Sequence, residues 1–407
     1  MSSDLASSDP APVRLPDGAI VRAAARADVP AMVRLEADRE GEDDAVDLQL
    51  VADTPGGLES MSVVERDGRI VSIATLLDET LTVGSTTLPA GQIEMVATAR
   101  DAEGRGYVRA LMNRSHALSA ARGHVVQVMI GIPHFYRQFG YAYSIRMHPW
   151  ATVRKELPTP EGYTTSVATP DDIATCQQLQ DHAQAAFDVT MPHSDDCWKW
   201  LTTHTSSKQV FAVTPDATPV GLARVYDDGE GSVDLGEIAS SDEDATRTLL
   251  AYGLDAAGPD GTVRVNDRPH VPGLSDQLEN AERAEWYYVR IEDPALLLQA
   301  LSPELISRAR SSGRDDGEAL LSFYRSHVRM TWSAQGVEVT TGGPLQAPVW
   351  AGGSGVPLDA LGTLVFGDGA EVLEDRWPDA LLGKQRELMH ILFPPQTADL
   401  LTFYLPS

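Results

Sequence analysis

The stretch IEMVATARDAEGRGYVRALMNRSHALSAARGHVVQVMIGIPHFYRQFGY, residues 93–141, decides the fold of the first part of the chain. An apolar, β-rich run, Ile93–Thr98, leads into the glycine loop Gly104-Arg105-Gly106. A helical pattern follows and ends near Gly123, with its apolar residues on one face at Val108, Leu111, Met112 and Leu118. A second β-branched run, Val125–Ile132, comes next. A glycine loop at a helix N-terminus presents backbone N–H groups and the positive end of the helix dipole, so this order predicts a phosphate or pyrophosphate site.

The composition is that of a globular protein, with 43% hydrophobic and 22% charged residues, and 407 residues predict two to three domains. No apolar run reaches the roughly 18 residues of a membrane-spanning helix. The N-terminal residues lack both the basic start and the apolar core of a secretion signal. We therefore expect a cytoplasmic protein without a membrane partner, beginning with a disordered arm at residues 1–16.

The net charge of −27 argues against nucleic acid as a partner, because no basic run is present to neutralise phosphates. The charge favours cationic ligands; the alternative is an acidic surface that serves solubility or salt adaptation. The two cysteines, Cys176 and Cys197, are expected to be reduced structural thiols. His193 lies four residues before Cys197 without a further pair of ligands, so no metal site is expected.

The sequence pattern of the first part of the chain is repeated, more weakly, further along. The segment Ala168–Leu179 resembles Ala24–Leu35, and Ser232–Ala239 followed by Asp244–Gly253 repeats the order strand, loop, helix. The connecting loop, residues 240–244, contains no glycine and three carboxylates, which would repel a pyrophosphate. This pattern predicts an α/β protein with a duplicated domain whose second copy has lost the anion site.

Two shorter signals complete the organisation of the chain. Asp67-Gly68 between the β-rich runs Met61–Arg66 and Arg69–Leu77 predicts a tight hairpin. From about Tyr288 the pattern changes to an amphipathic helix followed by alternating strands, which predicts a third, different domain.

Two motifs within residues 93–141 resemble those of the GNAT acetyltransferases. Residues 96–106, VATARDAEGRG, resemble the acetyl-CoA signature V-x-V-x-P-x-x-R-x-x-G, and residues 135–141, FYRQFGY, resemble the turn (I/F)-Y-x-x-F-G-(Y/F). Two departures from the signature matter: Arg100 stands at the proline and Glu103 at the first arginine. A glutamate beside a pyrophosphate is unfavourable unless it points away or pairs with an arginine. A Rossmann site is disfavoured, since Arg109 occupies the third glycine position.

The three-part layout is similar to that of the enhanced intracellular survival (Eis) family of N-acetyltransferases. The resemblance implies an α/β chain of two tandem GNAT-like domains, the second degenerate, followed by a sterol-carrier-like α+β domain. We place the catalytic domain at residues 17–155, the degenerate copy at 156–287 and the C-terminal domain at 288–407. The resemblance also implies a homo-oligomer, a hexamer, in which the C-terminal domain has a scaffold role.

The same resemblance assigns acetyl-CoA as the co-substrate, with no metal. The strand residues Val96, Ala97 and Thr98 would pair with the pantetheine amides. Gly131 and Ile132 would line the cofactor where the next strand splays away. The loop and first helical turn would hold the pyrophosphate through Gly104, Arg105, Gly106, Tyr107, Val108 and Arg109.

Acetyl transfer to an amine also needs an acid and a base. Tyr136 matches the family's general acid, and a phenol with a pKa near 10 suits protonation of a departing thiolate. The alternative is that Tyr136 only packs the turn with Phe135 and Phe139. In the Eis family the terminal carboxylate is the general base, which here is that of Ser407; the alternative is a docked but inert tail.

These assignments predict an acetyl-CoA-dependent N-acetyltransferase that acts on the primary amine of a cationic small molecule, aminoglycoside-like, or of lysine. One alternative is a binding or scaffold protein with a vestigial acyl-CoA site, which Glu103 and Arg100 motivate. The other is lipid binding through the C-terminal domain.

Overall fold

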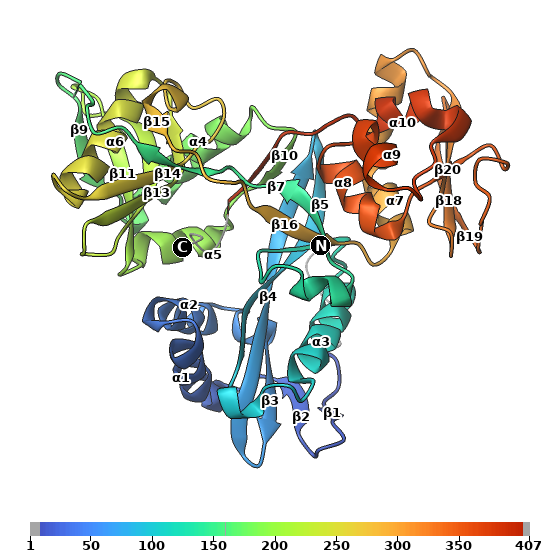
Figure 1. The fold of residues 1–407 in the computed structure, drawn as a ribbon, viewed down its shortest axis with the longest axis horizontal. Coiled ribbons are helices and arrows are strands. Elements are labelled where there is room, and N and C mark those ends of the chain that lie inside the picture. The colour runs from blue at the N-terminus through green and yellow to red at the C-terminus, as the bar shows by residue number, and fades with distance from the viewer. Residues whose placement is uncertain (1–8, 159, 402–407) are drawn as a thin grey trace. The chain divides into compact units, whose positions relative to one another are not determined.

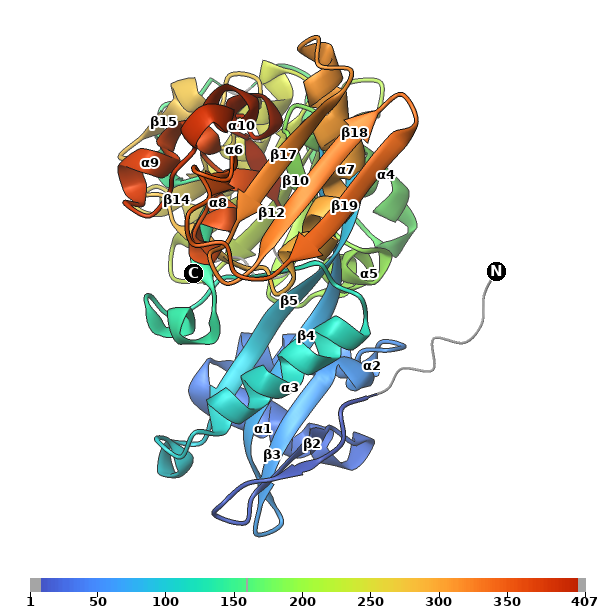
Figure 2. The ribbon, with the colours of Figure 1, turned by 90° about the vertical axis from the view of Figure 1, so that its right-hand side faces the viewer.

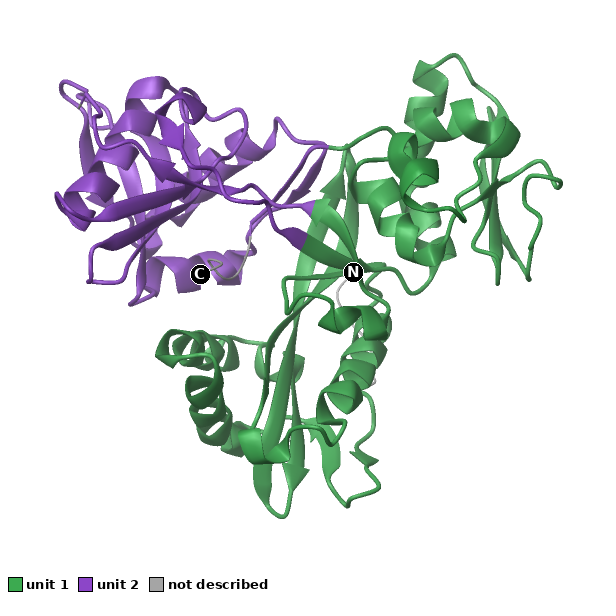
Figure 3. Cartoon of the chain, viewed as in Figure 1, with its two compact units in different colours: residues 1–145, 287–396 green, residues 146–286, 397–407 purple. Residues whose placement is uncertain are grey.

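The computed structural model describes residues 9–158 and 160–401. The chain divides into two compact units (Figure 3): unit 1 comprises residues 1–145 and 287–396, and unit 2 comprises residues 146–286 and 397–407. Along the described residues, no helix has the length and apolar character required to cross a membrane.

A mixed sheet forms the first part of unit 1. Its strands follow the order β1-β2-β3-β4-β5-β6-β16-β7. Neighbours from β1 to β5 are antiparallel, whereas β5 and β6 are parallel and are connected through α3 (Tyr107–Ala121). The strand bounds are β1 Val13–Arg14, β2 Ile20–Ala23, β3 Met61–Arg66, β4 Arg69–Val83, β5 Thr86–Thr98, β6 Val126–Met129, β7 Ala142–Arg146 and β16 Trp286–Arg290.

Local sequence signals in this sheet behave largely as expected. Asp67 and Gly68 have φ angles of 51° and 75° and connect β3 to β4, which confirms the predicted hairpin. Gly123 follows the end of α3 with a φ of 75°, as expected for a C-terminal glycine. Val13–Arg14 pair with β2, and Asp9 forms an ion pair with Arg114, so this part of the predicted arm has a defined structure.

Helices cover both faces of the sheet (Figures 1 and 2). Helices α1 (Val29–Arg39) and α2 (Glu42–Asp53) lie on one face, and α3 lies on the other. Met95 in β5 has a φ of 51°, and the register of β4 and β5 shifts between Ile73 and Thr75. This bulge allows Ile93 and Val96 to share one apolar cluster with α3, although they are three positions apart on a strand.

The second part of unit 1 is a smaller α+β arrangement. Helix α7 (Pro294–Ser311) packs on a sheet of order β19-β18-β17-β20, seen from its open face in Figure 2. Burial alternates along β18, where Val328, Met330 and Trp332 face inward. The remaining bounds are β17 Gly317–Ser322, β18 His327–Ser333, β19 Gly336–Gly342, β20 Ser354–Gly355, α8 Leu361–Phe366, α9 Leu373–Arg376 and α10 Arg386–Leu392. The likeness to sterol-carrier domains stays a prediction.

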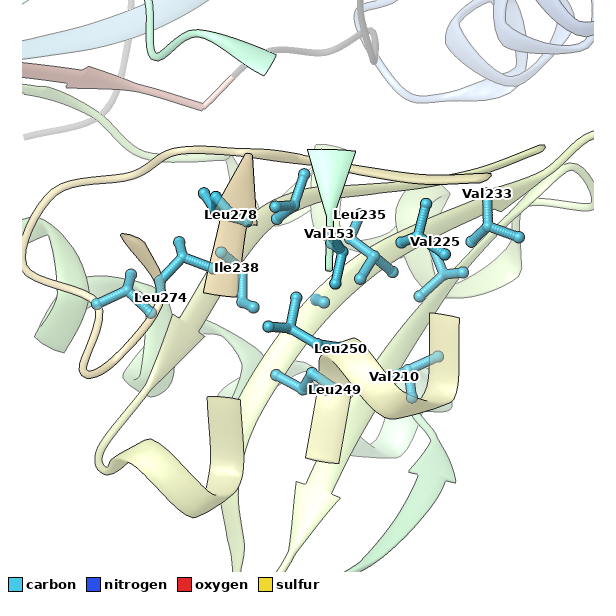
Figure 4. Packing of buried hydrophobic residues seen from close by; sticks show 14 of the residues in the cluster. Val153, Val210, Val225, Val233, Leu235, Ile238, Leu249, Leu250, Leu274 and Leu278 are labelled. Atoms are coloured by element: carbon cyan, nitrogen blue, oxygen red, sulfur yellow. The ribbon is translucent and has the colours of Figure 1, made fainter. Parts of the chain in front are cut away.

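Unit 2 contains a second sheet, of order β15-β8-β14-β13-β12-β11-β9. Its core packs α6 (Glu243–Ala257) against the central strands, with Leu249 and Leu250 of α6 beside Val210, Val225 and Leu235 (Figure 4). The parallel strands β13 and β14 flank α6, as β5 and β6 flank α3. The other bounds are β8 Trp150–Val153, β9 Thr164–Val167, β11 Ser207–Val213, β12 Pro219–Asp227, β13 Ser232–Ser240, β14 Thr262–Asn266, β15 Leu278–Glu279, α4 Ile173–Gln184 and α5 Asp195–Thr203.

The two sheets exchange strands along the chain. Strand β8 follows β7 in sequence but pairs with β14 and β15 in the sheet of unit 2. Conversely, β16 follows β15 in sequence but pairs with β6 in the sheet of unit 1. Each unit is therefore built from two segments of the chain that are separated in sequence by a segment of the other unit. The three domains predicted from the sequence remain a prediction.

A buried ion pair fixes the end of the described chain within unit 2. Strand β21 (Ala398–Leu400) pairs in parallel with β10 (Val189–Met191). The carboxylate of Asp399 accepts hydrogen bonds from Arg268 Nε and Nη2 at 3.0 and 2.6 Å, and from Gln184 Nε2 at 3.0 Å. Arg268 and Asp399 are 1% and 2% exposed, so the pair is shielded from water. Ser407 lies outside the described residues.

Candidate active site

A cavity of about 480 Å³ opens at the carboxyl end of β5 in unit 1. It is bounded by the end of α1, the end of β5, the glycine loop, the first turn of α3 and the turn at residues 135–139. Its lining includes Arg39, Glu40, Val96, Thr98, Ala102, Glu103, Gly104, Gly106, Tyr107, Val108, Arg109, Ile132, Phe135, Tyr136, Gln138 and Phe139.

Most of the residues predicted for the site lie around this cavity. Among the described residues, three of those predicted do not line it. Ala97 is buried, and its carbonyl accepts a hydrogen bond from Ser72 Oγ at 3.0 Å. Arg105 is exposed to solvent, Gly131 lies behind the ring of Tyr136, and Ser407 is outside the described residues. The roles proposed for the lining residues remain predictions.

Strands β5 and β6 separate beside the cavity. They pair only from Ala90↔Val126 to Gln92↔Val128, whereas β5 continues to Thr98. The predicted strand Val125–Ile132 is correspondingly shorter, because β6 ends at Met129 and Gly131 and Ile132 lie beyond it. The described part of the chain gives β5 no strand partner on its β6 side after Gln92. Its backbone groups there are free to pair with an extended, amide-containing ligand.

The N-terminus of α3 is open toward the cavity. Gly106 is its N-cap residue with a φ of 81°, Gly104 has a φ of 72°, and no side chain caps the helix. Regular helix bonding begins with Ala110 N–H donating to Gly106 O at 3.1 Å. The N–H groups of the first turn, residues 107–109, therefore have no acceptor within the helix, and they coincide with the positive end of its dipole. Such an end is suited to a phosphate group.

The N-terminus of the corresponding helix of unit 2, α6, is capped by a side chain. The side chain of Asp242, the N-cap residue of α6, accepts a hydrogen bond from Ala245 N–H at 2.8 Å. Glu243 and Asp244 add two more carboxylates to this first turn. The α6 terminus is thus neutralised by its own sequence, which is the difference expected from the missing glycines.

Glu103, the unfavourable residue of the loop, is paired. Its Oε1 lies 3.0 Å from Arg39 Nη2 at the end of α1. The sequence reasoning stated that Glu103 would need an arginine nearby, but it did not identify Arg39. Nothing local in the sequence points to this partner, since the two residues meet only through the packing of α1 against the sheet.

Tyr136 is held in a buried aromatic cluster. It is 5% exposed, and its ring packs edge-on against Phe135 and Tyr288, at centroid distances of 5.1 and 6.0 Å. A Cβ added at Gly131 would lie 2.4 Å from Tyr136 Cε2, so Gly131 leaves the space that this ring occupies. Burial, and next the nearby carboxylate of Glu94, raise the pKa of Tyr136 well above its ordinary value. The phenol is therefore protonated throughout the physiological range, as a proton donor must be.

Buried carboxylates lie on the other face of the sheet, toward α1 and α2. Glu36 in α1 is 1% exposed and Glu94 in β5 is 6% exposed, and burial raises the pKa of each to about 8. Asp44 in α2 has its pKa raised to about 6, first by burial and then by Asp47. Sequence reasoning missed this cluster, although Glu94 inside the apolar run IEMVAT was a visible signal.

In unit 2, His193 contacts both Cys197 and Glu237. His193 Nδ1 lies 3.3 Å from Cys197 Sγ, and its Nε2 lies 2.9 Å from Glu237 Oε2. Because opposite ring nitrogens are used, the three groups do not converge on one point. Among the described residues, no group of three or more His, Cys, Asp or Glu side chains could hold a metal ion.

Residues 21–144 match the family model of the acetyltransferase (GNAT) domain. The chain contains a GNAT acetyltransferase domain. The open α3 terminus, the splayed strands and the Tyr136 turn all lie in this GNAT domain. The match confirms the expected enzyme class, an acetyl-CoA-dependent acetyltransferase. A comparison with curated proteins finds no match.

Solved structures share the fold along nearly the whole chain. A GCN5-related N-acetyltransferase from Kribbella flavida is 16% identical, with 94% of this chain and 97% of that chain covered and a TM-score of 0.65. A GCN5-related N-acetyltransferase from Anabaena variabilis is 13% identical, with coverages of 94% and 99% and a TM-score of 0.70. Eis1 from Mycobacterium abscessus is 15% identical, with coverages of 94% and 99% and a TM-score of 0.61. At these identities the likeness shows a common fold around the GNAT domain.

Proposed function

We propose that this protein is an Eis-like N-acetyltransferase that transfers an acetyl group from acetyl-CoA to a primary amine of a cationic small molecule, aminoglycoside-like, or of lysine. The observation that carries the proposal is the single cavity that brings the open N-terminus of α3 together with Tyr136. One end of this cavity suits a pyrophosphate, and the other presents a buried proton donor.

The cofactor would lie along the separated edge of β5. Its pantetheine amides would pair with the backbone of Val96 to Thr98, and its pyrophosphate would accept hydrogen bonds from Gly104 to Arg109. Ile132 would bound the opposite side, where β6 has ended. This arrangement leads the thioester toward Tyr136.

The reaction requires one bond to form and one to break. The neutral amine nitrogen attacks the thioester carbonyl carbon, the C–S bond breaks, and the CoA thiolate takes a proton from Tyr136. Burial raises the pKa of Tyr136, so its hydroxyl still carries a proton when the thiolate departs. The amine must lose its own proton to a base, for which we propose the Ser407 carboxylate.

The acidic cluster supports a cationic acceptor. Glu36 Oε2 is buried and has no hydrogen-bond partner among the described residues, and the same holds for Gln92 Oε1. Unpaired buried acceptors are costly, and an ammonium group would supply the missing donors. The net charge of −27 would also attract a polycation to the protein.

Acetyl transfer can be tested with a panel of amines that includes an aminoglycoside, a polyamine and a lysine peptide. Release of the CoA thiol would be followed in the presence of acetyl-CoA, with neutral amines as the comparison. We expect turnover that favours polycationic acceptors. Binding of acetyl-CoA without turnover of any amine in the panel would refute the proposed acceptor class. The absence of acetyl-CoA binding would refute the proposed function and favour the scaffold alternative, whose acyl-CoA site is vestigial.

A further inference from the structure

Arg39 is a cationic side chain at the cofactor cavity that lies outside the acetyl-CoA signature. It is the last residue of α1, and its side chain lines the same cavity as Gly104 and Gly106. Its Nη2 pairs with Glu103 Oε1 at 3.0 Å. Its Nε is buried and has no hydrogen-bond partner in the part of the chain that the structure describes.

The other arginines of this region serve the phosphate site less well. Arg100 and Arg105 are exposed and do not line the cavity. Arg109 lines it, but its Nη2 donates to Gln138 Oε1 at 2.5 Å and its guanidinium lies over the ring of Phe139. Of these four arginines, Arg39 lines the cavity and has a buried Nε–H group for which the described residues supply no acceptor.

The charge of Glu103 also favours a phosphate-binding role for Arg39. The loop carries Glu103 where the signature has an arginine, so its own side chains would place a negative charge beside a pyrophosphate. The bond to Arg39 neutralises that charge and at the same time fixes the guanidinium at the rim of the anion site. A guanidinium has five donors, and phosphate oxygens are acceptors that match its planar geometry.

We infer that Arg39 is a phosphate-binding residue for the CoA substrate, and that Glu103 is the residue that positions it. Helix α1 thereby supplies in space the cation that the loop lacks in sequence. The inference rests on the proposed function, because it names a further contact of the same cofactor site. The phosphate groups that Arg39 contacts distinguish CoA from pantetheine, which has the same amide arm without them.

Calorimetric titration of the full chain with CoA and with pantetheine tests this inference. For Arg39→Ala we expect the Kd of CoA to rise about tenfold or more, as for the loss of a charge-assisted bond. The Kd of pantetheine should stay unchanged, and the dependence of CoA binding on salt should weaken. Arg39→Lys, which keeps the charge, should recover part of the loss.

Two further variants separate a phosphate contact from a structural role. In Arg39→Ala the carboxylate of Glu103 is left unpaired, so adding Glu103→Gln should remove that repulsion but leave CoA affinity below that of the unmodified protein, because the phosphate contact is still missing. Full recovery in the double variant would overturn the inference, since Arg39 would then only neutralise Glu103. Glu103→Gln alone should lower CoA affinity less than Arg39→Ala does and leave pantetheine affinity unchanged, because Arg39 loses the residue that positions it. Arg26→Ala is the matched control, because Arg26 also forms an ion pair, with Asp53, but lies outside the cavity.

Unchanged CoA binding in Arg39→Ala would overturn the inference. An equal loss of CoA and pantetheine affinity would also overturn it, since the role of Arg39 would then be to hold the loop. If the unmodified protein binds no CoA, the proposed function fails together with the inference. If it binds CoA and Arg39→Ala binds equally well, only the inference fails.

Discussion

Substitution of Glu36 by glutamine should make unit 1 more stable, and the gain should grow with pH. Glu36 is 1% exposed, and burial followed by the charge of Asp44 raises its pKa from 4.5 to about 8. A carboxyl group whose pKa is raised on folding contributes stability below its unfolded pKa and loses that contribution as pH rises through its folded pKa. The relevant window therefore extends from about pH 4.5 to about pH 8.

The magnitude follows from these two pKa values. Each pH unit between them corresponds to ~1.4 kcal/mol, so ionised Glu36 lowers the free energy of unfolding by about 4 kcal/mol between pH 5 and pH 9. This value already includes the effect of the neighbouring acids Asp44, Glu40 and Asp47, which help to raise the pKa of Glu36. In Glu36→Gln the side chain cannot ionise, and the dependence on pH should flatten accordingly.

Hydrogen exchange measured by mass spectrometry at pH 5, 7 and 9 can follow this effect in peptides from α1 and β5. After correction for intrinsic exchange rates, Glu36→Gln should protect these peptides more than the unmodified protein at pH 9, and nearly equally at pH 5. Asp38→Asn, an exposed acid on the same helix, is the control and should change neither value. A stability of Glu36→Gln that varies with pH as steeply as that of the unmodified protein would refute the reasoning.

Three further predictions concern the site and the end of the chain. Tyr136→Phe should lower kcat about 100-fold or more while the Kd of acetyl-CoA stays nearly constant, since only proton donation is removed; unchanged turnover would assign Tyr136 to packing. Gly106→Ala and Gly123→Ala place a Cβ on residues with φ of 81° and 75° at opposite ends of α3, each in open space. Both should cost about 1–2 kcal/mol in unfolding experiments, but only Gly106→Ala should weaken CoA binding. Asp399→Asn should destabilise unit 2 by about 3–5 kcal/mol, because it leaves Arg268 buried with a neutral partner, and faster hydrogen exchange in β10 and β21 would report it. Burial opposes ionisation of Asp399, but Arg268 and His148 outweigh it and lower its pKa, so this stability should be lost only in acid.

The features that could be predicted from sequence are those fixed by neighbours along the chain. The Asp67-Gly68 turn, the α3 helix with its flanking glycines, and the order of loop and helix each depend on a few consecutive residues. Their conformational requirements, such as φ above zero at Gly104 and Gly106, can be inferred from residue type alone. The aromatic turn around Tyr136 belongs to the same group.

The features that could not be predicted depend on tertiary packing. Arg39 and Glu103 meet because α1 packs on β5, and no spacing in the sequence encodes that meeting. The bulge at Met95 changes which side chains of β5 face α3, although its sequence is compatible with a regular strand. Likewise, the pairing of β8 in the sheet of unit 2 and of β16 in the sheet of unit 1 joins strands that are distant in sequence, and no local pattern specifies it.

Helices α3 and α6 differ in how well the N-terminus of each would suit an anion. Both helices follow a strand that contains a residue with positive φ, Met95 at 51° and Glu237 at 54°, and both precede a parallel strand. They differ at the N-cap, where Gly106 has no side chain and Asp242 bonds to the first turn. A capping aspartate provides the negative charge that a phosphate would otherwise supply, so it stabilises the helix and removes the anion site in one step. The α3 helix lacks that internal cap, so an external anion would stabilise its terminus. The uncapped N-terminus of α3 therefore supports ligand binding chiefly because α6, in the equivalent position, has a capping aspartate.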